Sequence, residues 1–269
     1  MNTREYLTIS DAIVPDRTAI SFEGHRITFQ DLNLKVNRLA NGLRNLGIEP
    51  GDRIALIDVN GPALIETYLA AAQIDAIFVP LNYRAREEEL SQMLRLCEPT
   101  VLVVGSRYQE LVRTALKYNP PPNHVLAVEK RDGGQWIFYD DLIKSSSPYA
   151  TVSHSAEDND TTLLLFTAGT TGQPKAVMLS HHSFSSFMLS SVPPPDPEVE
   201  ERNILSVPMY HIAGMQSALA AIYGGRTLLL MRQFDPQEWM RLVQNEQADR
   251  AGLVPTMLKQ LVDHPNLLD

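Results

Sequence analysis

Short apolar runs that alternate with helical patterns most constrain the fold of this chain. From Ile54 onward the runs are rich in aliphatic and β-branched residues, and amphipathic stretches separate most of them. This alternation is typical of βαβ units around a mainly parallel sheet. We therefore predict an α/β fold built from layered βαβ subdomains with mainly parallel sheets. The predicted strands are 54–59, 76–80, 100–104, 124–128, 162–166, 204–208, 227–231 and 250–254.

The clearest helix is predicted directly after Thr28. Thr28 is a good N-cap residue, Asp31 suits the first helical turn, and Gly47 ends the helical pattern. Before this helix, residues 19–28 read as a small hairpin that turns at Glu23 and Gly24. One apolar face of the predicted helix comprises Leu32, Val36, Leu39, Leu43 and Leu46.

Residues 161–180 combine an apolar strand with a loop suited to anions. Gly169 and Gly172 allow backbone N–H groups to approach a phosphate closely, and Lys175 adds a positive charge. Open α/β sheets bind their ligands at the carboxyl ends of strands, where this loop is expected. Gln173 and Pro174 separate Gly172 from Lys175, so the loop is not a Walker A motif. A surface turn rich in glycine and threonine is the alternative.

Composition narrows the class of protein. At 269 residues the chain is long enough for two lobes or one large α/β unit. Its formal net charge of −9 argues against a nucleic-acid surface, although acidity also serves solubility. Cys97 is the only cysteine, which excludes an intramolecular disulfide and a zinc cluster built on cysteines, and we expect it to be a small core residue. The adjacent pair His181 and His182 does not match metal-ligand spacing, so no metal ligands are predicted.

The N-terminal residues and the hydrophobic runs lead to an expected location. The first residues lack the charged and then apolar order of a signal peptide. No apolar run approaches the roughly 20 residues that span a bilayer. We therefore expect a cytoplasmic protein without a transmembrane segment.

The stretch FTAGTTGQPKAVMLSH, residues 166–181, resembles the phosphate-binding signature of the adenylate-forming superfamily. This superfamily includes acyl-CoA synthetases, aryl-CoA ligases, luciferases and the adenylation domains of peptide synthetases. Ala168 replaces the usual serine, which removes one hydroxyl donor, and Ala176 replaces the usual glycine after the lysine. The resemblance implies that the loop holds the phosphates of ATP through Thr167, Ala168, Gly169, Thr170, Thr171, Gly172 and Lys175.

A second segment, PMYHIAG at 208–214, resembles the superfamily's Pro-x-x-His-x-x-Gly motif. The resemblance implies that His211 lies on the same rim as the phosphate loop and orients a carboxylate and the developing adenylate, with Lys175 as the other catalytic group. Amino-acid-activating members usually carry Phe-Asp at this point, so an acid without an α-amino group is expected. Ala213 stands where an aromatic ring often closes the acid tunnel, which favours an extended aliphatic acid. The alternatives are a structural histidine and an alanine that merely permits close helix packing.

The resemblance extends over nearly the whole chain from about residue 10. Residues 15–32 and 51–82 are similar to the superfamily's opening segments, although Asp75 stands where a glycine usually precedes the alanine. The motifs for adenine, ribose and magnesium, and the catalytic lysine of the C-terminal domain, are expected beyond Asp269. We therefore expect residues 1–269 to be the N-terminal part of an AMP-binding domain, with approximate lobes 1–160 and 161–269 and without the C-terminal domain.

The resemblance implies an ATP-dependent acid–CoA ligase, specifically a fatty acyl-CoA synthetase, that uses ATP, Mg²⁺ and coenzyme A. The chain by itself is expected to be inactive, and exposed apolar surface favours a homo-oligomer. Three alternatives stay open. They are a nucleotide-binding module without turnover, a structural or partner-binding protein that keeps only the fold, and an adenylation domain for a different acid.

Overall fold

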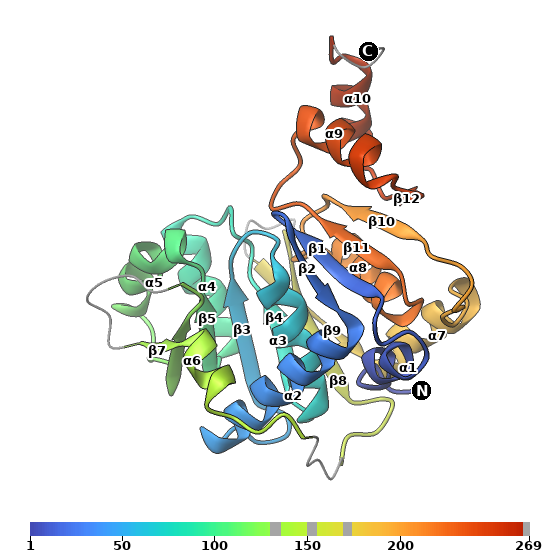
Figure 1. Ribbon diagram of the computed structural model, residues 1–269. Coiled ribbons are helices and arrows are strands. Elements are labelled where there is room, and N and C mark those ends of the chain that lie inside the picture. Colours follow the sequence, from blue (N-terminus) through green and yellow to red (C-terminus); the bar gives the residue numbers. More distant parts are fainter. Residues whose placement is uncertain (130–135, 150–154, 169–173, 266–269) are drawn as a thin grey trace. The chain divides into compact units, whose positions relative to one another are not determined.

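The computed structural model describes residues 1–129, 136–149, 155–168 and 174–265 (Figure 1). The chain forms two compact units, and each contains its own β-sheet. Unit 1 comprises Met1–Arg4, Leu34–Asp58 and Ala63–Phe187, and unit 2 comprises Glu5–Asn33, Val59–Pro62 and Met188–Asp269.

Unit 1 is built on a seven-stranded sheet with the order β7-β6-β5-β3-β4-β8-β9 (Figure 1). Neighbouring strands pair in parallel except β8 and β9, which form an antiparallel hairpin. The residues of β5 are all buried, as expected for a parallel strand covered on both faces. The strands are β3 (Arg53–Ile57), β4 (Ile77–Pro80), β5 (Val101–Val104), β6 (His124–Ala127), β7 (Ile137–Phe138), β8 (Thr161–Ala168) and β9 (Pro174–Ser180).

Helices connect these strands and bury an apolar core. The N–H of Asp31 donates to Thr28 Oγ1 at 3.0 Å, so Thr28 caps the predicted helix. Cys97 is buried, and burial raises the pKa of its thiol to about 12, which makes it an unreactive core residue as expected. The helices that lie wholly or mostly in unit 1 are α2 (Phe29–Asn45), α3 (Pro62–Gln73), α4 (Glu87–Cys97), η1 (Ser106–Tyr108), α5 (Gln109–Leu116), α6 (Tyr139–Lys144) and α7 (His181–Ser191).

Unit 2 contains a five-stranded sheet with the order β12-β10-β11-β1-β2. Asn203 on β10 donates from its side chain to Ser217 Oγ of α8, whereas its neighbour Ile204 packs on α9. Because successive side chains of a strand point to opposite faces, α8 and α9 cover the two faces of this sheet. The elements are α1 (Glu5–Ile13), β1 (Thr18–Phe22), β2 (His25–Thr28), β10 (Arg202–Leu205), α8 (Ile212–Tyr223), β11 (Thr227–Leu230), α9 (Pro236–Glu246), β12 (Arg250–Ala251) and α10 (Pro255–Val262).

The predicted fold class is confirmed, since both sheets are dominated by parallel pairs connected through helices. The compact units nevertheless follow other bounds than the expected lobes 1–160 and 161–269. Hairpin β8–β9 completes the sheet of unit 1, and α1 packs on α8 of unit 2 through the rings of Tyr6 and Tyr223, whose centroids are 5.2 Å apart. Within the described residues, no helix has both the length and the apolar character needed to cross a bilayer.

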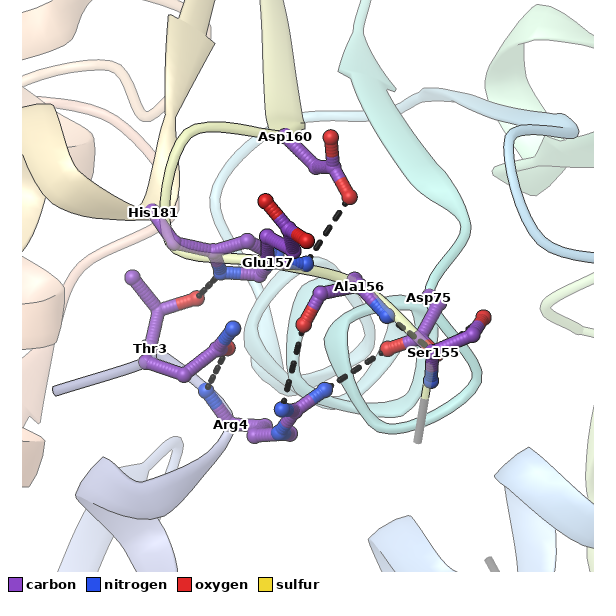
Figure 2. A network of polar contacts seen from close by, with 9 residues as sticks. Thr3, Arg4, Asp75, Ser155, Ala156, Glu157, Asp160 and His181 are labelled. Atoms are coloured by element: carbon purple, nitrogen blue, oxygen red, sulfur yellow. Dashed lines mark hydrogen bonds and ion pairs between the residues drawn. The ribbon is translucent and has the colours of Figure 1, made fainter. Parts of the chain in front are cut away.

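A polar network in unit 1 joins the first residues of the chain to His181 after β9 and to the segment that precedes β8 (Figure 2). Thr3 Oγ1 lies 2.8 Å from Nδ1 of His181, the residue that follows β9. Thr3 Oγ1 also accepts a hydrogen bond from the Tyr68 hydroxyl at 2.9 Å. The hydroxyl of Thr162, near the start of β8, donates to Tyr68 Oη at 3.4 Å. This buried chain of side chains ties α3 and the N-terminus to the base of the hairpin.

The buried His181 makes the stability of the chain sensitive to acid. Burial lowers the pKa of His181 from its ordinary value of 6.5 to about 4, and the nearby charge of Arg4 lowers it further. The imidazole is therefore neutral in the folded chain at a pH at which the unfolded chain binds a proton. Its contribution to stability is fully present above pH 6.5 and is lost as the pH falls toward 4. The slope approaches about 1.4 kcal/mol per pH unit between these values.

Urea denaturation between pH 7.5 and 4.5 tests this expectation. The unmodified chain is expected to lose stability more steeply than His181→Gln, whose amide keeps a polar partner for Thr3 but does not titrate. The acidic groups that face His181 are common to both proteins and cancel in the comparison; they are Asp75, Asp158 and Asp160. Equal slopes in the two proteins would exclude His181 as the source of the acid sensitivity.

Candidate functional site

The β8–β9 hairpin positions the residues of the proposed phosphate site that the structure describes. β8 pairs in parallel with β4, so Thr167 and Ala168 stand at the carboxyl edge of the sheet. The hairpin register pairs Thr167 with Lys175, and both residues are exposed. The side chains of Thr167 and Lys175 therefore start from paired backbone positions at the edge where the sequence predicts an anion site.

The contact between these two residues is weak. Thr167 Oγ1 lies 3.5 Å from the backbone oxygen of Lys175, at the outer limit of a hydrogen bond. A ligand oxygen can replace such a contact at little cost. Both side chains therefore have the chemistry and the exposure needed to bind a phosphate group.

Four of the predicted phosphate-binding residues lie outside the described part of the chain, namely Gly169, Thr170, Thr171 and Gly172. Ala168 ends β8, and its backbone pairs with that of Pro174. Strand β9 was not predicted, because residues 174–180 were expected to continue the loop that follows β8. Most side chains of β9 are exposed, so this strand lacks the burial pattern that reveals β8.

His211 lies at the N-cap of α8, after β10, as the sequence motif predicts. Its backbone is extended, with φ −102° and ψ 150°, and its oxygen accepts a hydrogen bond from the Met215 N–H at 3.1 Å. The His211 N–H donates to the Pro208 oxygen at 3.1 Å, which closes a tight turn before the helix. The imidazole is exposed beside the ring of Tyr210, with 4.1 Å between the ring centroids. Ala213 is also exposed, in the first turn of α8.

An exposed imidazole at a helix N-terminus suits the binding of an anion. Backbone N–H groups at such a terminus carry partial positive charge, and the imidazole adds a donor. His211 belongs to unit 2, whereas Thr167 and Lys175 belong to unit 1. The shared rim of His211 and the phosphate loop therefore stays a prediction.

Asn60, which contacts the segment before His211, belongs to neither of the sequence motifs. Its side chain donates to the backbone oxygen of Val207 and accepts from the N–H of Met209. The only signal for it in the sequence is a polar residue shortly after a buried strand. Within the described residues, no group of three His, Cys, Asp or Glu side chains is arranged to bind a metal ion.

Comparison with known proteins agrees with the layered α/β fold. Residues 10–268 match the protein family described as AMP-binding enzyme. The chain belongs to this family. Its fold is also that of a crystallised N-terminal domain of FACL13 from Mycobacterium tuberculosis, solved with a bound inhibitor. The TM-score is 0.87 at 26% sequence identity, and the match covers 100% of this chain and 66% of that one.

The curated relatives are CoA ligases. Feruloyl-CoA synthase of Amycolatopsis is 32% identical over 252 residues, which cover 93% of this chain and 48% of the relative. The long-chain-fatty-acid–CoA ligase FadD13 of M. tuberculosis is 29% identical over 246 residues, which cover 91% of this chain and 47% of the relative. The chain thus spans about half the length of the curated relatives it matches.

Proposed function

We propose that this chain is the N-terminal part of an ATP-dependent acid–CoA ligase that activates a carboxylic acid as an acyl-adenylate. The observation that carries the proposal is the pairing of Thr167 with Lys175 at the carboxyl edge of the sheet, in a member of the AMP-binding family. The reaction needs a site that holds the phosphates of ATP and a group that orients the acid. The chain offers the hairpin for the first task and His211 for the second.

In the first step a carboxylate oxygen attacks the α-phosphorus of ATP. The bond from that phosphorus to the bridging oxygen breaks, and pyrophosphate leaves. Thr167 and Lys175 neutralise and orient the β- and γ-phosphates, together with the loop residues between them. His211 donates to the carboxylate or to the phosphoryl oxygen. This chemistry relies on positioning and charge neutralisation rather than on a covalent bond to the protein.

In the second step the sulfur of coenzyme A attacks the acyl carbon. The bond to the adenylate oxygen breaks, AMP leaves, and the thiol proton passes to solvent. Mg²⁺ and coenzyme A are proposed as a cofactor and a substrate of the intact protein on the basis of the family and its CoA-ligase relatives. We also propose that residues 1–269 alone form little acyl-CoA.

Replacing His211 tests the first step. In the intact protein, His211→Ala is expected to lower kcat/KM for acid-dependent pyrophosphate release by about 100-fold, the usual effect of removing one donor to a developing charge. His25→Ala is the matched control, because His25 is an exposed histidine of the same unit and is expected to leave the rate unchanged. Equal rates for both variants would remove His211 from the reaction.

Ala213 supports the proposal of an extended aliphatic acid as substrate. Ala213 and Ile212 are exposed beside His211. The resemblance to the family implies that Ala213 stands where a ring would narrow an acid tunnel. Each methylene buried in an apolar tunnel contributes about 0.8 kcal/mol. Ala213→Phe is therefore expected to raise KM for long acids about tenfold or more and to spare short ones, measured as pyrophosphate release with acids of increasing length. Equal effects at every length would instead place Ala213 outside the acid tunnel.

Binding experiments discriminate the remaining alternatives. A nucleotide-binding module without turnover would bind ATP and an acyl-adenylate analogue but release no pyrophosphate with any acid. A partner-binding protein that keeps only the fold would show no stabilisation by either nucleotide. An adenylation domain for another acid would release pyrophosphate only with that acid.

A further inference from the structure

Asn60 is a buried polar residue whose side chain forms hydrogen bonds with the backbone of Val207 and Met209, which are far away in the sequence. The residue is only 2% exposed, and its segment, Val59–Pro62, belongs to unit 2. Asn60 Nδ2 donates to the Val207 oxygen at 3.0 Å, and Asn60 Oδ1 accepts from the Met209 N–H at 2.9 Å. The Asn60 N–H donates to the Arg232 oxygen at 3.2 Å, just beyond β11. One residue thus fixes two backbone groups of the β10–α8 connection relative to the end of β11.

The bracketed backbone leads directly into His211. β10 ends at Leu205, so the residues between it and α8 lie outside the strand ladder. The side-chain amide of Asn60 takes the place of a neighbouring strand, because it donates one hydrogen bond to this backbone and accepts another from it. Two residues after Met209, the turn from Pro208 to His211 places the imidazole at the start of α8. The position of His211 therefore depends on the backbone that Asn60 holds.

Gly214, which follows His211 in the sequence, packs closely against the same backbone. A Cβ atom at this position would lie 2.3 Å from the Pro208 oxygen and 2.9 Å from the Met209 Cα. Such distances are too short for any side chain, so the first turn of α8 packs directly on Pro208 and Met209. The connection is thus held by a hydrogen-bonding amide and by a close backbone contact.

We infer that Asn60 is a positioning residue for His211, which acts by fixing the Val207–Met209 backbone from which the imidazole projects. The catalytic role of His211 in this inference rests on the proposed function. The fixing of the backbone by Asn60 rests on the geometry of unit 2. A reacting group held in place by a rigid shell reaches its working geometry without further ordering. Asn60 itself touches no substrate in this scheme.

A double-mutant cycle in the intact protein tests the inference. Asn60→Ala is expected to lower kcat for acid-dependent pyrophosphate release by about tenfold to 100-fold, the range that a small misplacement of a reacting group produces. The KM for ATP is expected to change less than about threefold, since the hairpin and not His211 is assigned to the β- and γ-phosphates. In a His211→Ala background, Asn60→Ala is expected to cause no further loss, because it acts only through the imidazole.

Asn203 supplies the matched control. It is a buried asparagine of the same unit, and its bond to Ser217 joins β10 and α8 without touching Val207 or Met209. Asn203→Ala is expected to change kcat less than about twofold. Equal losses from Asn60→Ala in both backgrounds, or equal losses from Asn60→Ala and Asn203→Ala, would overturn the inference, because they would show a general loss of packing.

Amide hydrogen exchange on the 269-residue chain measures whether Asn60 protects the Met209 amide. The Met209 amide is expected to exchange at least tenfold faster in Asn60→Ala than in the unmodified chain or in Asn203→Ala. Unchanged exchange at Met209 would overturn the inference even if turnover fell. If His211→Ala left turnover intact, the proposed role of His211 and the catalytic part of this inference would both fail, and the Met209 amide would still decide whether Asn60 holds the segment.

A more conservative variant covers the case in which Asn60→Ala does not fold. Asn60→Asp is nearly isosteric and keeps an acceptor for the Met209 N–H, but it places an oxygen opposite the Val207 oxygen. It is expected to show a loss of kcat between those of the unmodified protein and Asn60→Ala, again only when His211 is present. Full activity of Asn60→Asp with unchanged Met209 exchange would show that only the acceptor oxygen of Asn60 matters. It would overturn the inference that both hydrogen bonds fix the backbone.

Discussion

Asp75→Ala is expected to lower the free energy of unfolding by about 3–5 kcal/mol, the usual cost of removing one partner from a buried ion pair. The Asp75 side chain is 1% exposed, and its Oδ1 accepts from Arg4 Nη1 at 2.8 Å. Its Oδ2 accepts from the N–H groups of Ser155 and Ala156 at 2.7 and 3.1 Å (Figure 2). Removing the carboxylate leaves a partly buried guanidinium and two backbone donors without this acceptor.

The backbone of Asp75 allows the carboxylate effect to be separated from strain. Asp75 has φ +59°, in the left-handed region that glycine adopts most easily. Asp75→Gly is therefore expected to be more stable than Asp75→Ala by about 1 kcal/mol, because it loses the carboxylate but relieves the strain. Chemical denaturation of the unmodified protein, Asp75→Ala and Asp75→Gly measures the loss of the carboxylate and the backbone strain separately. A loss below about 1 kcal/mol in Asp75→Ala would show that the network contributes little.

Lys35→Met is expected to lower the free energy of unfolding by a similar 3–5 kcal/mol. Lys35 on α2 lies 2.9 Å from Oε1 of Glu66 on α3, and the Glu66 side chain is 1% exposed. The Tyr139 hydroxyl donates to Glu66 Oε2 at 3.2 Å. Burial, together with the charge of Glu66, raises the pKa of Tyr139, so the hydroxyl stays a donor. Without Lys35 the buried carboxylate has lost the cation that compensates it.

The double variant Lys35→Met/Glu66→Leu is expected to recover most of this loss, because it removes the buried charge together with its partner. Lys144→Met is the control, since Lys144 is an exposed lysine of unit 1 and its replacement is expected to change stability by less than about 0.5 kcal/mol. Urea denaturation midpoints of the unmodified protein and these three variants test the expectation. A double variant no more stable than Lys35→Met would assign the loss to the packing of the lysine stem.

Local signals in the sequence predicted much of the fold. The hairpin turns at Glu23 and Gly24, which have φ values of +50° and +82°, and Thr28 caps α2 as its residue type indicates. The buried runs became the central strands of both sheets. Helix α1 and strand β9 were not predicted. The exposed side chains of β9 carry no burial pattern, and its pairing with β8 is decided by backbone hydrogen bonds rather than by side chains.

The same division applies to the candidate site. Glycine, threonine and lysine at fixed spacing predicted an anion loop, and Pro-x-x-His-x-x-Gly predicted a histidine between a strand and a helix. These signals are local, so they can be read along the chain. The sequence could not show that Thr167 pairs with Lys175, which follows from the register of the hairpin.

By itself the sequence determined the order of the buried strands, the fold class, and the segments that carry the proposed chemistry, because each depends on neighbouring residues. Only the tertiary structure decided which distant residues meet. It brought Asn60 to the backbone before His211, and it gathered Arg4, Ser155 and Ala156 around Asp75. Such contacts form when buried polar groups must find partners. The choice of partner depends on how the elements pack, which no local pattern records.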